Sequence, residues 1–420
     1  MNLQEIIDGL KGCPCGKQHT FDLKVFEADR GLVHKTGEIL NKAAFPKKLL
    51  IISDKNAMGV SKGLLESLKS SGFTYETKIY DDMRYAYYDD AMEIAGLMSD
   101  FDGLLSVGTG SINDICRYGA FKADKPLAIF ATAPSMDGFA SDSSPLIKNN
   151  FKISYLARQP MVVIADTDIL AASPTELKSA GYGDILAKYI AIVDWKVAKY
   201  TINEYYCDKI VDLVKKAIDK VVSLTDKVTA NDPQAAGAIM EGLILTGCAM
   251  QLAGCTRPAS GCEHVISHYW EIHKLEKGIW PEFHGKKVGV ATLLVAKIYK
   301  DLLKYKDINP VPDSFDMDDV LNHYSKSFKD DVLKMNNPQI TDEVDLAALK
   351  AHWPDIRQSI QDDIPDIDTL TDMMKRAGCA TTIQEVNVSD EMCRLGIKYS
   401  PYMRHRITLL RIINMLGIKD

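Results

Sequence analysis

The sequence predicts an α/β domain built on a parallel sheet, followed by an all-α domain, with a ligand cleft between the two. At 420 residues the chain is long for a single hydrophobic core, which favours two domains. Strand and helix patterns alternate up to about residue 168, and beyond it strand patterns nearly vanish. We therefore predict a sheet domain over residues 1–168 and a helical domain over residues 169–420.

Five apolar segments predict the strands. The first, KKLLIISD at residues 47–54, is a continuous apolar run that ends in Asp54, as is typical of a buried parallel strand. Helical periodicity follows over residues 56–71 and returns over residues 89–100, so strands and helices alternate as in right-handed βαβ units. The other predicted strands are residues 74–80, 103–107, 126–131 and 161–165.

The second half is predicted as a succession of helices. One of them has a clear start signal, because Asp232 is a good N-cap and Pro233 suits the first helical position. The predicted helices lie near residues 174–200, 204–229, 232–254, 262–274, 285–304, 317–335, 342–360, 366–378 and 390–416.

Composition argues against several classes of function. A net charge of −7 and a pI near 5.8 predict no nucleic-acid partner and no membrane-surface role. The longest apolar segment, Gly242 to Cys255, is about one helix long and contains Gln251, so it is predicted to be a buried core helix. The amino terminus shows no export signal and the nine cysteines are scattered, so we expect a cytoplasmic protein with reduced thiols.

A short amino-terminal segment, CPCGKQH, places Cys13, Cys15 and His19 close together. These three side chains are metal ligands in many proteins, but a structural zinc site needs a fourth donor. No fourth donor is visible nearby in the sequence, so we interpret the segment as a structural turn, with a zinc site as the alternative.

The segment CEHVISHYWEIHKLEKGIWPEFHG, from Cys262 to Gly285, contains the strongest metal signal. In a helix His264 and His268, four residues apart, share one face, and His284 stands at the start of the next apolar-periodic run. Two of these imidazoles with one carboxylate would satisfy a catalytic metal site, which needs about three protein ligands. The alternative is that the pair is hydrogen-bonded in the core and His284 caps a helix.

Two loops that follow predicted strands suggest a nucleotide site. In SVGTGSIND, Gly108 and Gly110 allow a tight turn, and Ser111 opens a helix whose free N–H groups suit a pyrophosphate. This is neither the Rossmann glycine motif nor a Walker loop, and a tight turn that needs glycine is an equally good reading. The loop TAPSMDGFASDSSP is long and rich in hydroxyl groups. There Asp137 could bind a polyol, and Thr132, Ser135 and Ser141 could meet the cofactor, unless it is an ordinary solvated loop.

Two acids complete the set of candidates. Asp54, at the end of its strand, matches the acid that binds the ribose 2′-hydroxyl, which favours NAD over NADP, although Lys55 beside it weakens this inference. Asp184 in GYGD could join His264 and His284 at a metal ion, or it could be a capping acid near the start of its helix.

Five motifs in order resemble one enzyme family: GTGSIND, TAPSMDGFAS, GYGD, SGCEHVISHYWE and FHGKKVGVAT. They are similar to the glycerol-1-phosphate dehydrogenase branch of the iron-containing alcohol dehydrogenase and dehydroquinate synthase superfamily, and CPCGKQH resembles the lead segment of its bacterial members. The resemblance implies a Rossmann-like amino-terminal domain, an all-helical carboxyl-terminal domain and an active site in the cleft between them. It also implies interconversion of sn-glycerol 1-phosphate and dihydroxyacetone phosphate with NAD or NADP.

The resemblance also assigns roles to residues. Asp184, His264 and His284 would bind one divalent metal, zinc or nickel, while His268 and Asp137 would contact substrate hydroxyls. We expect His268 to relay a proton, which a pKa near neutrality would suit. The nucleotide would be lined by Gly110, Ser111, Asp114, Thr132, Ser135 and Ser141.

Several features stay open at this stage. The phosphate needs cations, and the candidates near the motifs are Lys188, Lys286, Lys287 and, as first choice, Arg257. We expect a homo-oligomer, a dimer or larger. Alternatives are a glycerol or polyol dehydrogenase without a phosphate site, a dehydroquinate synthase-like lyase, and a catalytically silent nucleotide-binding protein.

Overall fold

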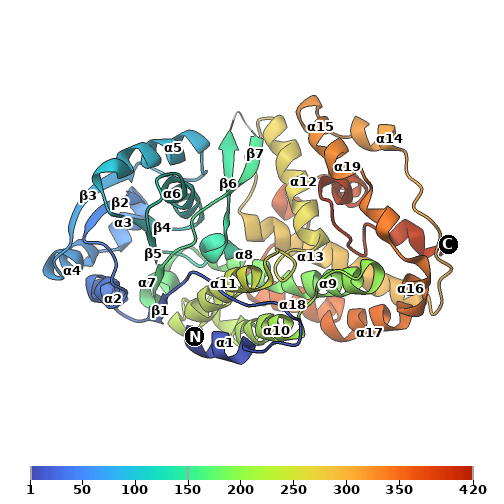
Figure 1. Ribbon diagram of the computed structural model, residues 1–420, viewed down its shortest axis with the longest axis horizontal. Coiled ribbons are helices and arrows are strands. Elements are labelled where there is room, and N and C mark those ends of the chain that lie inside the picture. Colours follow the sequence, from blue (N-terminus) through green and yellow to red (C-terminus); the bar gives the residue numbers. More distant parts are fainter. Residues whose placement is uncertain (1, 149–150, 419–420) are drawn as a thin grey trace.

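A parallel six-stranded sheet forms the core of the amino-terminal part, at the left of Figure 1. The computed structural model describes residues 2–148 and 151–418. The strand order is β1-β8-β5-β4-β2-β3 and neighbouring strands are parallel. The strands are β1 (Val25–Asp29), β2 (Lys48–Asp54), β3 (Thr74–Tyr80), β4 (Gly103–Gly108), β5 (Leu127–Ala131) and β8 (Val162–Asp166).

Five of these strands confirm the predicted segments to within about a residue, whereas β1 was missed. β1 pairs only with β8, at one edge of the sheet, and it is short and carries Glu27. An edge strand needs no continuous apolar run, so its sequence did not stand out. Side chains alternate between the two faces of the sheet: Ile51 packs in the cluster of α2 and α4, and Ile52 in the cluster of α5 and α6.

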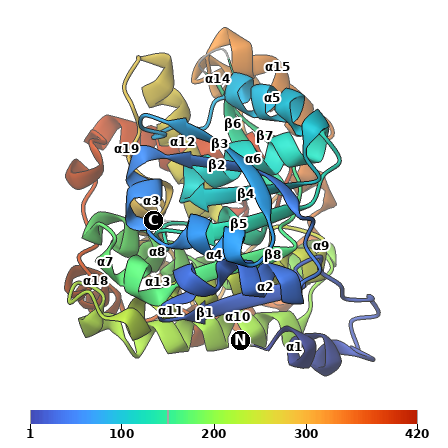
Figure 2. The same ribbon diagram turned by 90° about the vertical axis from the view of Figure 1, so that its left-hand side faces the viewer.

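Helices cover both faces of the sheet, as Figure 2 shows. They are α2 (Thr36–Lys42), α3 (Lys55–Val60), α4 (Leu64–Ser70), α5 (Tyr88–Leu97) and α6 (Gly110–Lys122). The helix predicted over residues 56–71 is in fact split into α3 and α4. The break is at Gly63, whose φ of +96° belongs to the left-handed region that a continuous helix does not use.

A separate antiparallel hairpin, β6 (Ser143–Lys148) and β7 (Phe151–Leu156), stands between the sheet and the helical part (Figure 1). It was not predicted: the loop expected over residues 132–145 is shorter, contains a 3-10 turn at Asp137–Ala140, and leads into β6. The β-rich segment with Ile153 and Tyr155 was a usable strand signal. β7 brings Lys152 toward α12, which matters for the site.

The remaining chain is helical, and the succession of helices is confirmed with shorter members than predicted. The helix predicted over residues 174–200 is divided at Ala187, and the one predicted over residues 317–335 is interrupted from His323 to Ser325. The helix predicted over residues 390–416 ends early, before Ser400-Pro401, because proline cannot continue a helix. The elements are α7 (Thr167–Ala172), α8 (Thr175–Leu186), α9 (Lys188–Ile202), α10 (Asp208–Val222), α11 (Pro233–Ala253), α12 (Cys262–Glu276), α13 (His284–Asp301), α14 (Met317–Asn322), α15 (Lys326–Met335), α16 (Leu346–Ala351), α17 (Trp353–Asp363), α18 (Ile367–Arg376) and α19 (Asp390–Tyr399).

Helix α11 joins the two parts of the molecule. As predicted, Asp232 caps it by accepting the backbone N–H of Ala235 at 2.9 Å, and Pro233 opens it. Met240 and Ile244 pack in the core of the sheet part, while Leu243 packs in the core of the helical part. By length and composition α11 would be able to cross a membrane, but 83% of its most apolar window is buried inside the protein, which is the position of a core helix.

Part of the segment before β1 packs on the helical part, while Leu23, just before β1, belongs to a core cluster of the sheet part. The segment begins with α1 (Leu3–Leu10), which has Asn2 as its N-cap and was not predicted. Leu10 and Cys13 belong to the core of the helical part, so the chain starts there before it enters the sheet at Val25.

Candidate active site

A cleft of about 1430 Å³ opens between the sheet part and the helical part. It is larger than the ~300–1,000 Å³ of a pocket for one small ligand, so a dinucleotide and a substrate fit side by side. Its lining comes from the ends of β2 and β5, the start of α6, the hairpin, α12, the start of α13 and the loop after α19. Predicted residues on its wall are Asp54, Gly110, Ser111, Asp114, Thr132, Ser135, Asp137, Ser141, His264, His268 and His284.

His264 and His284 line this cleft and meet Asp184, which is buried beside them and does not line the cleft. One ligand atom from each lies within 4.8 Å of the others, and Nε2 of His264 is 3.5 Å from Oδ1 of Asp184. The rings of His264 and His284 have their centroids 5.3 Å apart. Asp184 is fully buried and lies in the last turn of α8, which ends at Leu186, so the alternative of an acid near the start of its helix is wrong.

Two glycines allow the helices that carry Asp184 and His284 to touch. A Cβ on Gly285, at the start of α13, would lie 2.0 Å from the carbonyl oxygen of Ala180 on α8. A Cβ on Gly183 would lie 2.9 Å from the carbonyl oxygen of Gly285. Any larger residue at these positions would separate the two helices and pull the acid away from the imidazole.

Glu263, which the sequence did not single out, orients His264. Its Oε1 lies 2.6 Å from Nδ1 of His264, so Nδ1 carries the proton and Nε2 points toward Asp184. Carboxylate–histidine pairs of this kind hold the imidazole of many metal sites in one tautomer. Burial and Lys188 favour the neutral ring, but the hydrogen bonds to Asp184 and Glu263 prevail and raise the pKa of His264 to about 9.

Lys188 lies in a different place from the phosphate position for which the sequence made it a candidate. Its ammonium group is buried and donates to Oδ2 of Asp137 at 2.7 Å and Oδ1 of Asp184 at 2.8 Å. The backbone N–H of Asp137 also donates to Oδ2 of Asp184, at 2.9 Å. Burial raises the pKa of Asp184, but Lys188 and the two histidines outweigh it and hold that pKa well below its usual range.

His268 faces the cleft one turn beyond His264. Its ring centroid is 5.6 Å from that of His284, and its Nδ1 is 3.4 Å from Oε2 of Glu271. Burial lowers the pKa of His268 to about 4, with Glu271 acting in the opposite direction and Arg404 and Lys152 adding to the decrease. A proton relay would suit a pKa near neutrality; the pKa of His268 lies below that range, so the ring is neutral at physiological pH.

The predicted nucleotide residues gather where the order of the sheet reverses. From β2 the chain first adds β3 on one side, and then returns to place β4 on the other side. Asp54 and Gly108 therefore end adjacent strands at the crevice where open α/β sheets bind ligands. Asp54 is mostly buried and caps α3 by accepting the N–H of Ala57 at 2.7 Å.

The turn from β4 into α6 leaves a helix start free to face the cleft. Thr109 is the N-cap but makes no capping bond; its hydroxyl instead contacts Oγ of Ser135 at 2.7 Å. The first N–H groups of α6 are therefore open to an anion, as in other nucleotide sites. Gly108 does not line the cleft; a Cβ there would lie 2.8 Å from Cβ of Ile112, so this glycine permits the tight approach of strand and helix.

Three other predicted residues line the same region. Oγ of Ser141 accepts the backbone N–H of Ser143 at 3.0 Å, so this hydroxyl shapes the turn before the hairpin. The backbone N–H of Thr132 donates to the carbonyl of Gly108 at 3.0 Å. Asp114 is mostly buried, and burial raises its pKa to about 6 despite Arg117 and Lys152.

None of the four predicted phosphate cations lines the cleft. Arg257 pairs with Glu204, its Nε lying 2.6 Å from Oε1, and the ammonium groups of Lys286 and Lys287 are 3.0 Å and 3.3 Å from Glu176 and Glu271. Lys152 and Arg404 line the cleft close enough to His268 to lower its pKa, and Arg406 lines the same cleft beside Ser260 and Thr256. The arginines follow Pro401, which breaks the predicted helix, so that proline was the signal for a loop there.

Comparisons with known proteins agree with this architecture. Residues 27–174 match the family model described as iron-containing alcohol dehydrogenase. Among solved structures, a glycerol dehydrogenase from Schizosaccharomyces pombe has a TM-score of 0.65 at 15% identity over 96% of this chain and 88% of that chain. A probable glycerol dehydrogenase from Sinorhizobium meliloti has a TM-score of 0.62 at 14% identity over 95% and 97%. These likenesses establish the fold.

Curated relatives are more similar in sequence. Glycerol-1-phosphate dehydrogenase [NAD(P)+] of Halalkalibacterium halodurans is 32% identical over 301 residues, which are 70% of this chain and 75% of the relative. The protein with the same name from Geobacillus stearothermophilus is 27% identical over 422 residues, 99% of this chain and 98% of the relative. The chain therefore belongs to the glycerol-1-phosphate dehydrogenases [NAD(P)+], within the iron-containing alcohol dehydrogenase family.

Proposed function

We propose that this chain is a metal-dependent oxidoreductase that interconverts sn-glycerol 1-phosphate and dihydroxyacetone phosphate with NAD or NADP. The observation that carries the proposal is the meeting of Asp184, His264 and His284 in a cleft that also contains a free helix start and a group of cations. The names of the curated relatives support the same reaction.

The donor set suits a first-row transition metal. Two imidazoles and one carboxylate favour zinc, nickel or iron over magnesium or calcium, which prefer oxygen donors. Three protein donors leave a coordination position for substrate, as a catalytic site requires. Within this choice we propose zinc or nickel, held by Asp184, His264 and His284.

The chemistry divides between bound groups and the residues of the chain. An ion held by Asp184, His264 and His284 would supply a Lewis acid that lowers the pKa of the substrate C2 hydroxyl, and a bound nicotinamide would supply the hydride acceptor. Lys188 keeps Asp184 ionised in a buried setting and donates to Asp137, whose pKa burial and Asp184 nevertheless raise. Glu263 keeps Nε2 of His264 directed at the site. His268 is neutral and faces the cleft, so it accepts a hydrogen bond from a substrate hydroxyl and passes the proton toward solvent.

The phosphate is assigned to Lys152, Arg404 and Arg406. Arg406 is held in place by a hydrogen bond from Nη1 to the carbonyl of Ser260 at 2.8 Å, and it also donates to the hydroxyl of Thr256. Arg404 is exposed on the cleft wall, close enough to His268 to lower its pKa. Arginine suits this task because its planar guanidinium binds phosphate through two parallel hydrogen bonds.

The nucleotide is assigned to the crevice between β2 and β4. The pyrophosphate would lie on the start of α6, at Gly110 and Ser111, and the adenosine ribose would lie near Asp54. Lys55, which weakened the preference for NAD at the level of sequence, has its ammonium group 2.5 Å from Asp81, so its charge is matched there.

Steady-state kinetics test this proposal. Rates with both enantiomers of glycerol phosphate and with glycerol are measured with NAD and with NADP, before and after removal of metal by a chelator. We expect activity on sn-glycerol 1-phosphate that is lost on chelation and restored by zinc or nickel. Equal rates on glycerol would indicate a polyol dehydrogenase, a reaction without net NADH would indicate a lyase, and full activity after verified metal removal would overturn the mechanism.

A further inference from the structure

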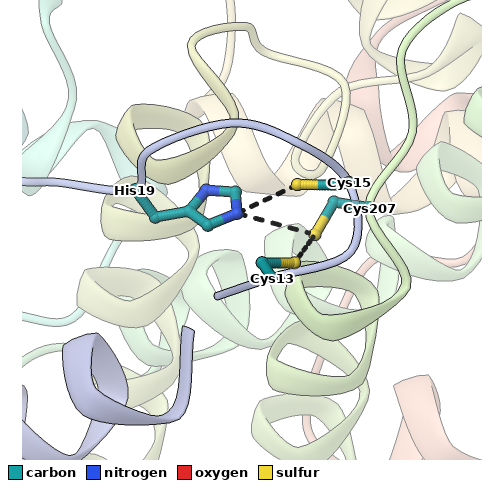
Figure 3. Close-up of side chains that lie close together, drawn as sticks. All are labelled: Cys13, Cys15, His19 and Cys207. Atoms are coloured by element: carbon teal, nitrogen blue, oxygen red, sulfur yellow. Dashed lines mark hydrogen bonds between the residues drawn. The ribbon is translucent and has the colours of Figure 1, made fainter. Parts of the chain in front are cut away.

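A second group of side chains that can bind a metal lies outside the cleft, where the segment after α1 meets the start of α10 (Figure 3). It consists of Cys13, Cys15 and His19, from the segment after α1, and Cys207, which directly precedes α10. One donor atom from each lies within 4.8 Å of the others. None of these residues lines the cleft, so the cluster is distinct from the site at Asp184.

Folding supplies the fourth donor that the sequence lacked. Cys207 lies 188 residues after His19 in the chain, yet its Sγ is 4.0 Å from Nε2 of that ring. The interpretation of CPCGKQH as a structural turn assumed that no fourth donor was present. Cys207 is that donor, so the assumption does not hold. Four protein donors of the Cys₃His type are typical of structural zinc sites.

His19 is oriented as a metal ligand. Its Nδ1 lies 2.7 Å from the carbonyl oxygen of Leu252, near the end of α11, so Nδ1 carries the proton and donates. Nε2 is then unprotonated and faces the sulfur atoms of Cys15 and Cys207, as Figure 3 shows. A histidine that binds a metal through one ring nitrogen usually donates a hydrogen bond from the other ring nitrogen, often to a backbone carbonyl.

Three distances between donors, from 3.1 to 4.0 Å, lie on both sides of the spacing expected around a tetrahedral ion. With Zn–S near 2.3 Å and Zn–N near 2.0 Å, tetrahedral donors are ~3.6–3.8 Å apart. Sγ of Cys13 is 3.5 Å from Sγ of Cys207, and Nε2 of His19 is 3.1 Å from Sγ of Cys15. A disulfide would require two sulfur atoms to be ~2.0 Å apart, and the three cysteines are free. The three sulfur atoms and the imidazole nitrogen are close enough together to bind one ion.

We propose that Cys13, Cys15, His19 and Cys207 bind a second divalent metal ion, a structural zinc with a complete set of protein ligands. With four ligands there is no open position for a substrate. Tyr205 supports the site from outside, because its hydroxyl lies 3.5 Å from Sγ of Cys15 and can donate to a thiolate.

The ion ties the amino-terminal segment to the helical part. Between α1 and β1 the segment contains no helix or strand, and its contacts run to the helical part. Lys17 donates to the carbonyl of Ala253, at the end of α11, at 3.0 Å, and its Nζ lies 3.6 Å from the ring centroid of Tyr205, in the loop before α10. The segment leads into β1, the edge strand of the sheet. A link between Cys15 and Cys207 closes a loop that contains all the strands and helices α7 to α9, and long loops gain most from such closure.

Metal analysis of the whole protein tests this proposal. Wild type loaded with zinc and freed of loose ions is expected to hold two ions per chain by mass spectrometry of the elements. Asp184→Ala, which removes a ligand of the cleft, should retain one. Cys15→Ser and Cys207→Ser should lose the other, whereas Cys393→Ala, at a cysteine on α19 outside the cluster, should keep both.

Two further measurements test the proposal even if a cysteine variant folds poorly, because they use variants that keep all three cysteines. Asp184→Ala loaded with cobalt should show sulfur-to-metal charge-transfer absorption, which the cleft ligands cannot produce because they include no thiolate. His19→Cys should keep the ion and His19→Gln should lose it. Absence of that absorption, a single ion that Asp184→Ala removes, or a Cys13–Cys207 disulfide in freshly purified protein would each overturn the second site.

Discussion

Oε1 of Glu263 lies 2.6 Å from Nδ1 of His264, and this contact decides which nitrogen of the imidazole faces Asp184. Neighbours in the chain therefore have different parts in the proposed site: His264 would bind the metal ion, and Glu263, the residue before it, orients the ring. Glu263 is fully buried, and its other oxygen, Oε2, has no hydrogen-bond partner among the described residues. The pair explains how a single helix, α12, can hold a ligand with a defined tautomer.

Replacing Glu263 by Gln should weaken metal binding without removing a ligand. An amide is a weaker acceptor than a carboxylate and does not enforce the tautomer, and changes of this kind cost ~10–100-fold in metal affinity. Chelator competition measures the effect. Glu276→Gln is the matched control, because Glu276 pairs with His273 at 3.3 Å on the same helix, away from the ligands. Equal affinity in the Glu263 variant and wild type would contradict the orienting role.

Metal binding should release a proton near neutral pH. The pKa of His264 is raised to about 9 in the metal-free protein, so the ring must lose its proton to bind the ion. Titration calorimetry in buffers of different ionisation enthalpy measures the release, expected to be about one proton per ion. His352→Gln, at an exposed histidine paired with Asp355, should release the same number. A release of no protons would contradict protonation of His264 in the free site.

The same shift predicts how the stability of the metal-free protein depends on pH. The folded pKa of His264 exceeds the ordinary value of 6.5, so its stabilisation is complete below pH 6.5 and is lost as pH rises through about 9. Chelated wild type should therefore lose thermal stability over this interval, and metal-loaded protein should lose less. In metal-free His264→Asn the decrease of thermal stability with pH should be smaller. An unchanged dependence of thermal stability on pH would show that other groups cause the decrease.

Arg404→Ala should reduce activity on phosphorylated substrate alone. A charge-assisted hydrogen bond contributes ~1.5–3 kcal/mol, so kcat/KM for glycerol phosphate should fall by ~10–100-fold while the rate on glycerol changes little. Arg394→Ala, an exposed arginine on α19, is the matched control. If both substrates lose activity equally, Arg404 does not recognise the phosphate.

Asp54→Asn should shift cofactor preference toward NADP. The amide still accepts the N–H of Ala57 and so caps α3, but the negative charge that repels a 2′-phosphate is gone. The ratio of kcat/KM for NAD to that for NADP is therefore expected to fall. Asp29→Asn, at the end of the edge strand β1, should leave the ratio as it is. An unchanged ratio for Asp54→Asn would remove this acid from the ribose site.

The sequence by itself determined the features that local patterns encode. Continuous apolar runs such as residues 47–54 predicted buried strands, and Asp232-Pro233 predicted the start of α11, because strand burial and helix capping act within a few residues. Motif order also indicated Asp184, His264 and His284 as a group. The edge strand β1 and the hairpin were missed because a half-exposed strand needs no continuous apolar run.

Only the tertiary structure decided which side chains meet. Lys188 and Arg257 were both candidates for the phosphate, with Arg257 as first choice, but packing buried Lys188 between two carboxylates and paired Arg257 with Glu204. Cys207 became the fourth donor beside His19 only because α10 packs against the amino-terminal segment. Such contacts depend on how helices distant in the chain approach one another, and spacing along the sequence carries no information about that approach.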